Sequence, residues 1–98
     1  NFTKACLRRA IMVEGNFKKA LFIKAEMEGT ICREADFSEA DFTQASISEA
    51  DFRKANLADV IFRDTNWKET NMWGVINFEE QYLIKFLEDM KASIHYKK

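Results

Sequence analysis

Residues 35–59 read ADFSE-ADFTQ-ASISE-ADFRK-ANLAD, so alanine returns every fifth residue and a large apolar residue follows two places later. The same phase continues on both sides of this stretch. The large places hold only apolar residues: Phe2, Leu7, Met12, Phe17, Phe22, Met27, Cys32, Phe37, Phe42, Ile47, Phe52, Leu57, Phe62, Trp67 and Met72. The small places run in step from Ala5 to Val75 and hold only alanine, glycine, threonine or valine. A repeat this regular has to be explained before any single helix or strand is assigned.

A period of five fits neither an α-helix nor a flat strand. On an α-helix five residues advance by about 140°, which would spread the pattern over all faces. On a flat strand, alternate repeats would point to opposite sides of the sheet. All repeats face one axis only if the chain turns between them, which predicts a solenoid whose coils hydrogen-bond at a spacing of about 4.8 Å. Its predicted packed core includes Phe17, Phe22, Phe37, Phe42, Phe52, Phe62 and Trp67.

The motifs ADFSE, ADFTQ, ADFRK and ANLAD resemble the pentapeptide-repeat pattern, A-(D/N)-(L/F)-x-x, over residues 1 to about 76. The resemblance implies an all-β solenoid: a right-handed, four-sided β-helix with twenty residues per coil, and so slightly under four coils. It assigns residues 1–76 to this β-helix. The place before the large residue departs from the pattern early, with Cys6, Ile11, Leu21, Glu26 and Ile31 instead of Asp or Asn. We expect less regular turns there, because a side chain that can bond nearby backbone is missing.

The repeat fails at Asn77, where a helical period begins. Asn77 is the predicted N-cap, with Glu80 in the capping-box place, for a helix from Phe78 to about His95. Leu83, Phe86, Leu87, Met90 and Ile94 form its apolar stripe, extended by Phe78 and Tyr82. We interpret residues 77–98 as a capping helix with a basic tail, since a solenoid ends in bare strand edges and an open core. Docking of the stripe on another chain is the alternative.

Composition and charge limit the classes of function. The 98 residues are 47% apolar, with no proline, three glycines and a net charge of −1. Residues 1–25 carry six bases and one acid, and residues 26–64 carry four bases and ten acids. Two cysteines without a CxxC arrangement favour a reduced, cytosolic environment, and no apolar run is long enough to span a membrane. The chain begins in phase with the repeat and without methionine, which indicates an upstream segment or a fragment.

The sequence offers no converging catalytic groups, so we predict that the protein is not an enzyme. His95 is the only histidine and lies in the basic tail, and outward Cys6 has no histidine partner. Cys32 is predicted to be an apolar core filler. Asp36, Asp41 and Asp51 are expected on different sides of the coil and in turn hydrogen bonds rather than around a metal. We therefore expect no catalytic residue, cofactor, metal or small-molecule substrate.

An outward apolar patch carries the functional prediction. Its members lie on the first two coils: Ile11, Val13, Leu21, Ile23 and Ile31. Such a patch more often marks an interface than an accident, so we predict an interaction scaffold that binds another protein or its own copy. Packing of an upstream segment of the same polypeptide is an equal alternative. Arg8, Arg9, Lys18, Lys19 and Lys24 flank the patch and suit an acidic partner or simple solubility.

A second hypothesis also comes from the family resemblance. Some pentapeptide-repeat proteins protect DNA gyrase by imitating duplex DNA with a long acidic rod, and the family is especially abundant in cyanobacteria. The acidic middle segment supports a DNA mimic that binds gyrase or another topoisomerase. A rod of under four coils, on the order of 20 Å long, and its interrupting bases Arg33, Arg53, Lys54, Arg63 and Lys68 argue against it. Direct nucleic-acid binding is disfavoured, because no exposed aromatic residues alternate with the bases.

Overall fold

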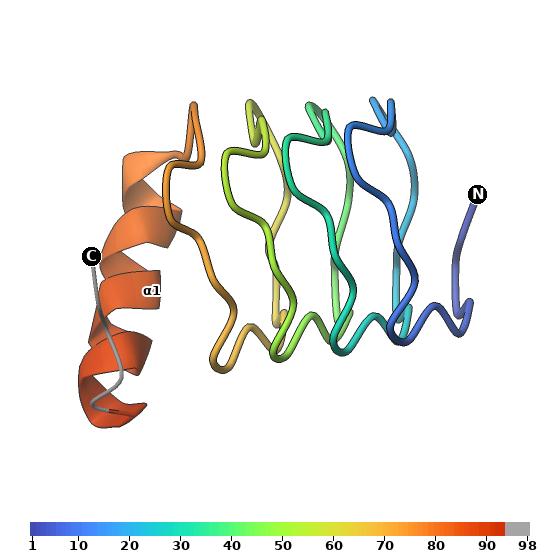
Figure 1. Cartoon of the computed structure of the whole chain (residues 1–98). Helices are drawn as coiled ribbons and strands as arrows, with labels where there is room; N and C mark the ends of the chain where they lie inside the picture. The colour runs from blue at the N-terminus through green and yellow to red at the C-terminus, as the bar shows by residue number, and fades with distance from the viewer. Residues whose placement is uncertain (94–98) are drawn as a thin grey trace.

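The computed structural model describes residues 1–93, with side chains up to Met90, and shows a stack of coils followed by one helix (Figure 1). Parallel β-bridges join residues twenty apart, from Cys6–Glu26 to Asn56–Ile76. Four columns of bridges start at Cys6, Ile11, Asn16 and Leu21, so each coil has four sides. Over the described residues the pairing takes the form of isolated bridges rather than continuous strands, because the chain turns a corner after every repeat.

The backbone ladder between coils is directional. The amide of Phe22 donates to the Asp41 carbonyl at 2.8 Å and the amide of Lys24 donates to the Thr43 carbonyl at 2.9 Å, both toward the C-terminal end. One amide per repeat donates the other way, as from Asp41 to the Ala20 carbonyl at 3.0 Å. The pattern recurs along the coils and pairs backbone groups that burial would otherwise leave unsatisfied.

Each corner is a tight turn with a left-handed residue. The Ala25 amide donates to the Phe22 carbonyl at 3.0 Å, and Lys24 between them has a φ of 60°. One bond across the turn and a single positive φ at the third residue are the features of a type II turn. The expectation of less regular turns in the N-terminal third is wrong, since Arg9 and Glu34 have φ of 62° and 60°. The ladders on both sides of a corner fix its shape, so the Asp or Asn side chain is not needed there.

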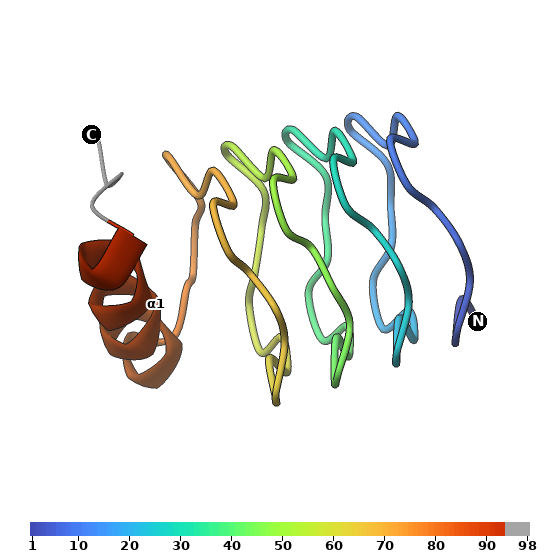
Figure 2. The ribbon, with the colours of Figure 1, turned by 90° about the horizontal axis from the view of Figure 1, so that it is seen from below.

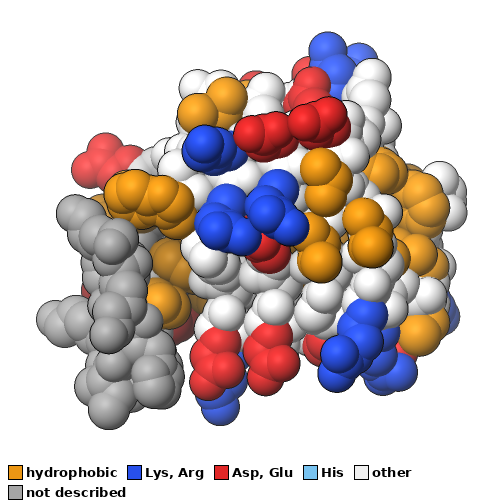
Figure 3. Space-filling model, in the orientation of Figure 1, with side chains coloured by type: hydrophobic (Ala, Val, Ile, Leu, Met, Phe, Trp, Pro, Cys, Tyr) orange, Lys and Arg blue, Asp and Glu red, His pale blue; other side chains and the backbone are white. Residues whose placement is uncertain are grey.

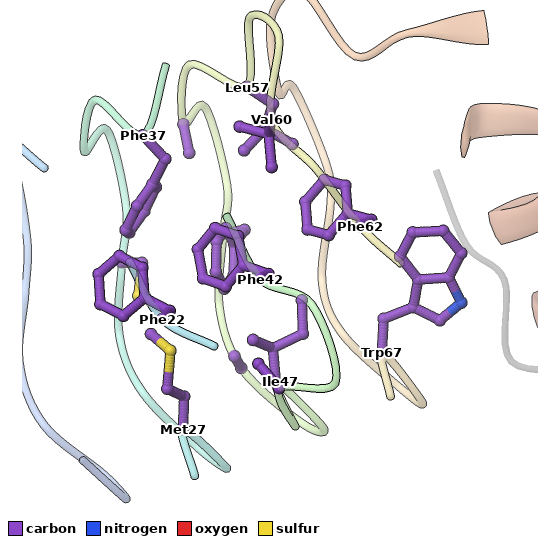
Figure 4. Packing of buried hydrophobic residues seen from close by; sticks show 14 of the residues in the cluster. Phe22, Met27, Phe37, Phe42, Ile47, Leu57, Val60, Phe62 and Trp67 are labelled. Atoms are coloured by element: carbon purple, nitrogen blue, oxygen red, sulfur yellow. The ribbon is translucent and has the colours of Figure 1, made fainter. Parts of the chain in front are cut away.

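The core consists of columns of large residues with alanines between them (Figure 4). Phe22 stacks on Phe42 with ring centroids 4.8 Å apart, and Phe42 stacks on Phe62 at 5.4 Å. The predicted core residues are buried except Phe17, which is only half-buried because its coil is the first. Inward Thr70 is buried, and its hydroxyl donates to the Ile47 carbonyl at 2.8 Å. The period of five therefore predicts the interior correctly.

The helix α1 runs from Glu80 to Ser93. The predicted N-cap is wrong: Asn77 has a left-handed φ of 63°, and its side-chain amide donates to the Asn56 side chain at 3.1 Å. The Glu79 carbonyl accepts the first helical bonds, from the amides of Tyr82 and Leu83. Asn77 is therefore still held by the coil below it, and the helix starts later than the sequence pattern indicates. The predicted helix end at His95 and the stripe residue Ile94 lie outside the described residues.

Helix α1 lies across the C-terminal end of the stack (Figure 2). Phe86 and Met90 are buried, Leu87 is half-buried, and Leu83 is 38% exposed. The predicted apolar stripe thus faces the solenoid along only part of its width. No helix in residues 1–93 is long and apolar enough to cross a bilayer.

Candidate interaction surface

Where the place before the large residue holds Asp, its side chain hydrogen-bonds the backbone of the following turn. The Asp36 Oδ1 accepts hydrogen bonds from the Ser38 amide at 2.9 Å and from the Ser38 hydroxyl at 2.8 Å. The backbone bond from Ser38 is the main reason that the pKa of Asp36 lies below its usual range. Asp41 and Asp51 accept from the backbone amides two residues later in the same way. This confirms turn hydrogen bonding as the explanation of the ADF carboxylates.

The predicted patch does not form one surface. Ile11, Val13 and Ile31 share the column 11–31–51–71, which we call the Ile11 side. Leu21 and Ile23 belong to the column 21–41–61, the Leu21 side. These columns are two repeats apart in a four-sided coil and therefore face opposite directions. Two repeats make half a turn, so the idea of one continuous patch is wrong.

The Ile11 side carries the more exposed apolar group. Ile11 is 75% exposed, Val13 is 41% exposed, and Ile31 lies half-buried between the first and third coils. Figure 3 shows apolar side chains gathered toward the N-terminal end of one face and basic ones in its middle. On the opposite side, Leu21 is 38% exposed and Ile23 is half-buried. An aliphatic side chain as open as Ile11 contributes little to the core beneath it.

A compact ion cluster follows the apolar residues on the Ile11 side. The Arg53 guanidinium binds both Asp51 carboxylate oxygens, at 2.9 and 2.8 Å, and Arg33 approaches the same carboxylate at 3.3 Å. Burial alone would raise the pKa of Asp51, but the hydrogen bonds and charge of Arg53 hold it below its usual range. The fork of Arg53 fixes the geometry and leaves one net positive charge in the cluster.

The flanking bases are distributed around the first coils rather than along one edge. Arg8 pairs with Glu26 at 2.9 Å and with Glu28 at 3.2 Å, both in the next coil. Arg9 and Lys19 each occupy a left-handed corner. Arg9 lies at the corner before the Ile11 side, and Lys19 lies at the corner before the Leu21 side. In the described part of the chain neither of these corner bases has an ion pair. The open rim at this end is therefore basic.

The two cysteines have opposite environments and are both free thiols. Cys6 is exposed, whereas Cys32 is completely buried and lies 3.4 Å from the Thr30 hydroxyl. Burial raises the pKa of the Cys32 thiol to about 12, as expected for an apolar filler. Residues 1–93 contain no group of three or more His, Cys, Asp or Glu side chains that could hold a metal ion.

A groove beside α1 was not predicted from the sequence. It has a volume of about 610 Å³ and lies between α1 and the last residues of the Ile11 side, with Met72, Val75, Leu83 and Leu87 among its walls. Trp73 forms part of the rim and is 53% exposed. Trp67 contacts Phe86 ring to ring, while Met72 and Trp73 line this groove. The only feature of the sequence that points to this groove is the apolar stripe of the helix, which is wider than the part of the coil end that it contacts.

A family model, pentapeptide repeats (8 copies), matches residues 1–37 and 35–74. This chain belongs to the pentapeptide-repeat family. Membership of this family implies a right-handed quadrilateral β-helix. No curated protein sequence matches the chain.

Solved pentapeptide-repeat proteins resemble the chain at low identity. Rfr23 from the cyanobacterium Cyanothece 51142 is 23% identical over 74% of this chain and 62% of its own, with a TM-score of 0.37. A protein of the Arabidopsis thaliana thylakoid lumen is 19% identical over 80% and 68%, with a TM-score of 0.40. HetL of Nostoc sp. strain PCC 7120, involved in the regulation of heterocyst differentiation, is 17% identical over 76% and 45%, with a TM-score of 0.31. The chain thus spans less than two thirds of the length of Rfr23 and of HetL.

Proposed function

We propose that the protein is a non-enzymatic interaction scaffold that binds another protein, or its own copy, through the N-terminal coils of the Ile11 side. The observation that carries this proposal is the exposure of Ile11, at 75%, beside Val13 and Ile31 on a regular backbone. A parallel β-bridge joins Ile11 to Ile31 and holds the backbone of both residues in place before binding. Less conformational freedom is therefore lost on binding, and burial is converted more fully into affinity.

The basic groups around these residues are available to pair with acidic groups of a partner. Arg9 stands at the corner beside Ile11 and has no ion pair in residues 1–93, and the Arg33–Asp51–Arg53 cluster adds one net positive charge, although Glu14 and Glu34 at corners of the same side carry the opposite charge. Complementary charge speeds encounter and selects the partner, whereas the apolar centre supplies most of the binding energy.

The test replaces the two most central side chains without disturbing the coil. Ile11→Asn with Ile31→Asn removes the apolar surface but supplies the same turn-bonding amide that Asn71 provides in this column, where its Oδ1 accepts from the Trp73 amide at 3.0 Å. Asparagine avoids the row of carboxylates that aspartate would create beside Asp51. We expect loss of the partner from an affinity capture, or loss of self-association in sedimentation, with an unchanged melting temperature.

The matched control uses the opposite side of the same coils. Leu21→Asn with Ile23→Asn also removes two aliphatic side chains, on the Leu21 side, and should preserve binding. Equal loss of binding in both variants would reject the proposal, since it would show a general effect on the coils. A large drop in melting temperature for the Ile11 and Ile31 variant would show that these residues pack within the chain.

We also propose that α1 acts as the cap of just under four coils. The supporting contacts are Phe86 on Trp67, with centroids 5.3 Å apart, and the Trp67 indole, whose Nε1–H donates to Asp89 Oδ2 at 2.7 Å. Trp67→Phe should lower both the helix content in far-UV circular dichroism and the melting temperature. Asp89→Asn retains an acceptor and should cost less. Two variants with equal effects would contradict the role of this hydrogen bond.

Mimicry of duplex DNA is the weaker candidate. The acidic residues of the middle coils alternate with Arg33, Arg53 and Lys54, and the longest dimension of the chain is 33 Å. A DNA mimic needs continuous negative charge along its length. Capture of gyrase or another topoisomerase, unaffected by the Ile11 and Ile31 variant, would reverse this ranking.

A further inference from the structure

We propose that the groove beside α1 is a second binding site, which takes one extended segment of a partner polypeptide as an added strand on the Ile11 side. A bulky apolar residue of that segment enters the groove. The site lies at the opposite end of the solenoid from Ile11, so it does not depend on the function proposed above.

Helix α1 covers only half of the last coil. Phe62 and Trp67 contact Tyr82 and Phe86 of the helix with centroids 5.6 and 5.3 Å apart, and both are only 5% exposed. The other half of the cross-section contains Met72 and Val75, which remain half-buried. The groove occupies this second half.

The backbone ladder ends at the groove, where the last coil still presents the backbone amides that would bond a further coil. On the Ile11 side of the coil below, the amides of Phe52 and Lys54 donate to the carbonyls of Asn71 and Trp73 at 2.9 and 3.0 Å. The equivalent amides one coil later are those of Met72 and Gly74, and neither has an acceptor among the described residues.

A backbone carbonyl beside these two amides is also without a partner among the described backbone groups. The Asn71 amide donates back to the Ala50 carbonyl at 2.9 Å, but the equivalent carbonyl of Thr70 receives no donor from the described backbone. Two donors and one acceptor therefore stand in the register that a further strand requires. Addition of a strand to such an edge gives affinity through the main chain, while a pocket selects the side chain.

The groove supplies that pocket. It measures about 610 Å³, is lined by Met72, Val75, Leu83 and Leu87, and also contains residues 69–71, 73 and 74 in its wall. In earlier coils the residue between the bonded positions points inward, as Phe52 does. The same placement puts the middle residue of an added strand into the groove. The middle residue of the added strand is therefore best a phenylalanine, leucine or methionine. The residues on either side of it must have unpaired backbone amide and carbonyl groups.

The register assigns each bond of the segment. The residue before the apolar one donates its amide to the Thr70 carbonyl and accepts from the Met72 amide. The residue after the apolar one accepts from the Gly74 amide. The amide of the apolar residue itself points away from the solenoid, as the amides of the large places do toward the next coil.

The test titrates the full-length, nitrogen-15-labelled chain with an acetylated and amidated peptide of the sequence of residues 48–56, SEADFRKAN. At a peptide concentration of about 1 mM, where weak peptide binding is detectable, we expect the Met72 and Gly74 amides to shift and exchange more slowly. The Phe52 and Lys54 amides, which are already bonded, should not change. A peptide methylated on the amide of its aspartate should bind at least about tenfold more weakly, and one methylated on the amide of its phenylalanine should bind normally.

A pair of variants on α1 tests the pocket. Leu87→Arg fills the groove and should abolish the shifts, whereas Ile84→Arg places the same charge at a position that is 51% exposed and outside the groove wall. If Leu87→Arg releases α1, as circular dichroism would show, the two methylated peptides still decide the question.

Several outcomes would overturn the proposal. If the Met72 and Gly74 amides do not shift, the peptide does not add as a strand. If only residues of α1 shift, the peptide binds the surface of the helix instead. Without peptide, the Met72 and Gly74 amides should exchange faster than those of Phe52 and Lys54. Equally slow exchange would show that the two amides are already hydrogen-bonded and that no strand can be added. Equal binding of the two methylated peptides would exclude the assigned register.

Discussion

Phe42→Ala should lower the free energy of unfolding by about 3–5 kcal/mol, the range for truncating a fully buried phenylalanine. Phe42 has no exposed surface and packs between Phe22 and Phe62, with centroids 4.8 and 5.4 Å away. The cavity would open in the middle of the stack, where coils depend on both neighbours. Urea unfolding followed by tryptophan fluorescence measures the loss, because Trp67 reports the far end of the same core.

The matched control is Phe2→Ala, in the same column but at the open end. Phe2 is half-buried, stacks on Phe22 with one face at 5.0 Å and makes an edge contact with Phe17 at 6.3 Å, so its truncation should cost about 1 kcal/mol. The ratio between the two variants is the decisive quantity. Equal losses would refute the reasoning, since they would show that Phe2 is covered in solution or that the column is not the unit of stability.

Three further predictions concern side chains outside this column. Because the pKa of Asp36 is lowered by the Ser38 amide, its stabilising contribution is present above the unfolded pKa of about 4 and disappears as pH falls through the lower folded value; Asp36→Asn should flatten this part of a stability–pH curve. At neutral pH a thiol reagent should label Cys6 quickly and Cys32 only after unfolding, because burial raises the Cys32 pKa to about 12; rapid double labelling of the native chain would contradict this. Glu49 has a φ of 60°, so Glu49→Val should cost about 1–2 kcal/mol in thermal melts and Glu49→Gly should not.

The sequence predicted the solenoid and its interior because the inward places are identical in type from coil to coil. Alanine at the small place and phenylalanine at the large place report burial directly, as Ala40 and Phe42 show. The turn role of the ADF carboxylates also follows from residue type, since Asp and Asn commonly bond an amide two residues ahead.

Other features depend on geometry that a one-dimensional pattern does not contain. The sequence lists Ile11 and Leu21 as similar outward residues, but only the four-sided coil shows that they face opposite ways. Asn77 reads as a helix cap because it precedes Glu80, yet its bond to Asn56 in the coil below keeps it in the solenoid. The groove arises from where α1 crosses the last coil, which no local pattern specifies.

Because the chain turns a corner after every fifth residue, each repeat advances the outward side chains by a quarter of a turn. Inserting or deleting one whole repeat preserves the alternation of small and large inward places, so the core can re-form around the change. Every outward side chain beyond it, however, turns by a quarter of a circle relative to the coils before it. Such a change between Ala35 and Asp36 would separate Ile11, Ile31 and Arg33 from Asp51 and Arg53, and would turn α1 by a quarter of a circle relative to the first coil. Gain or loss of single repeats can therefore redistribute the surface of this protein among its four directions without a single substitution in its interior.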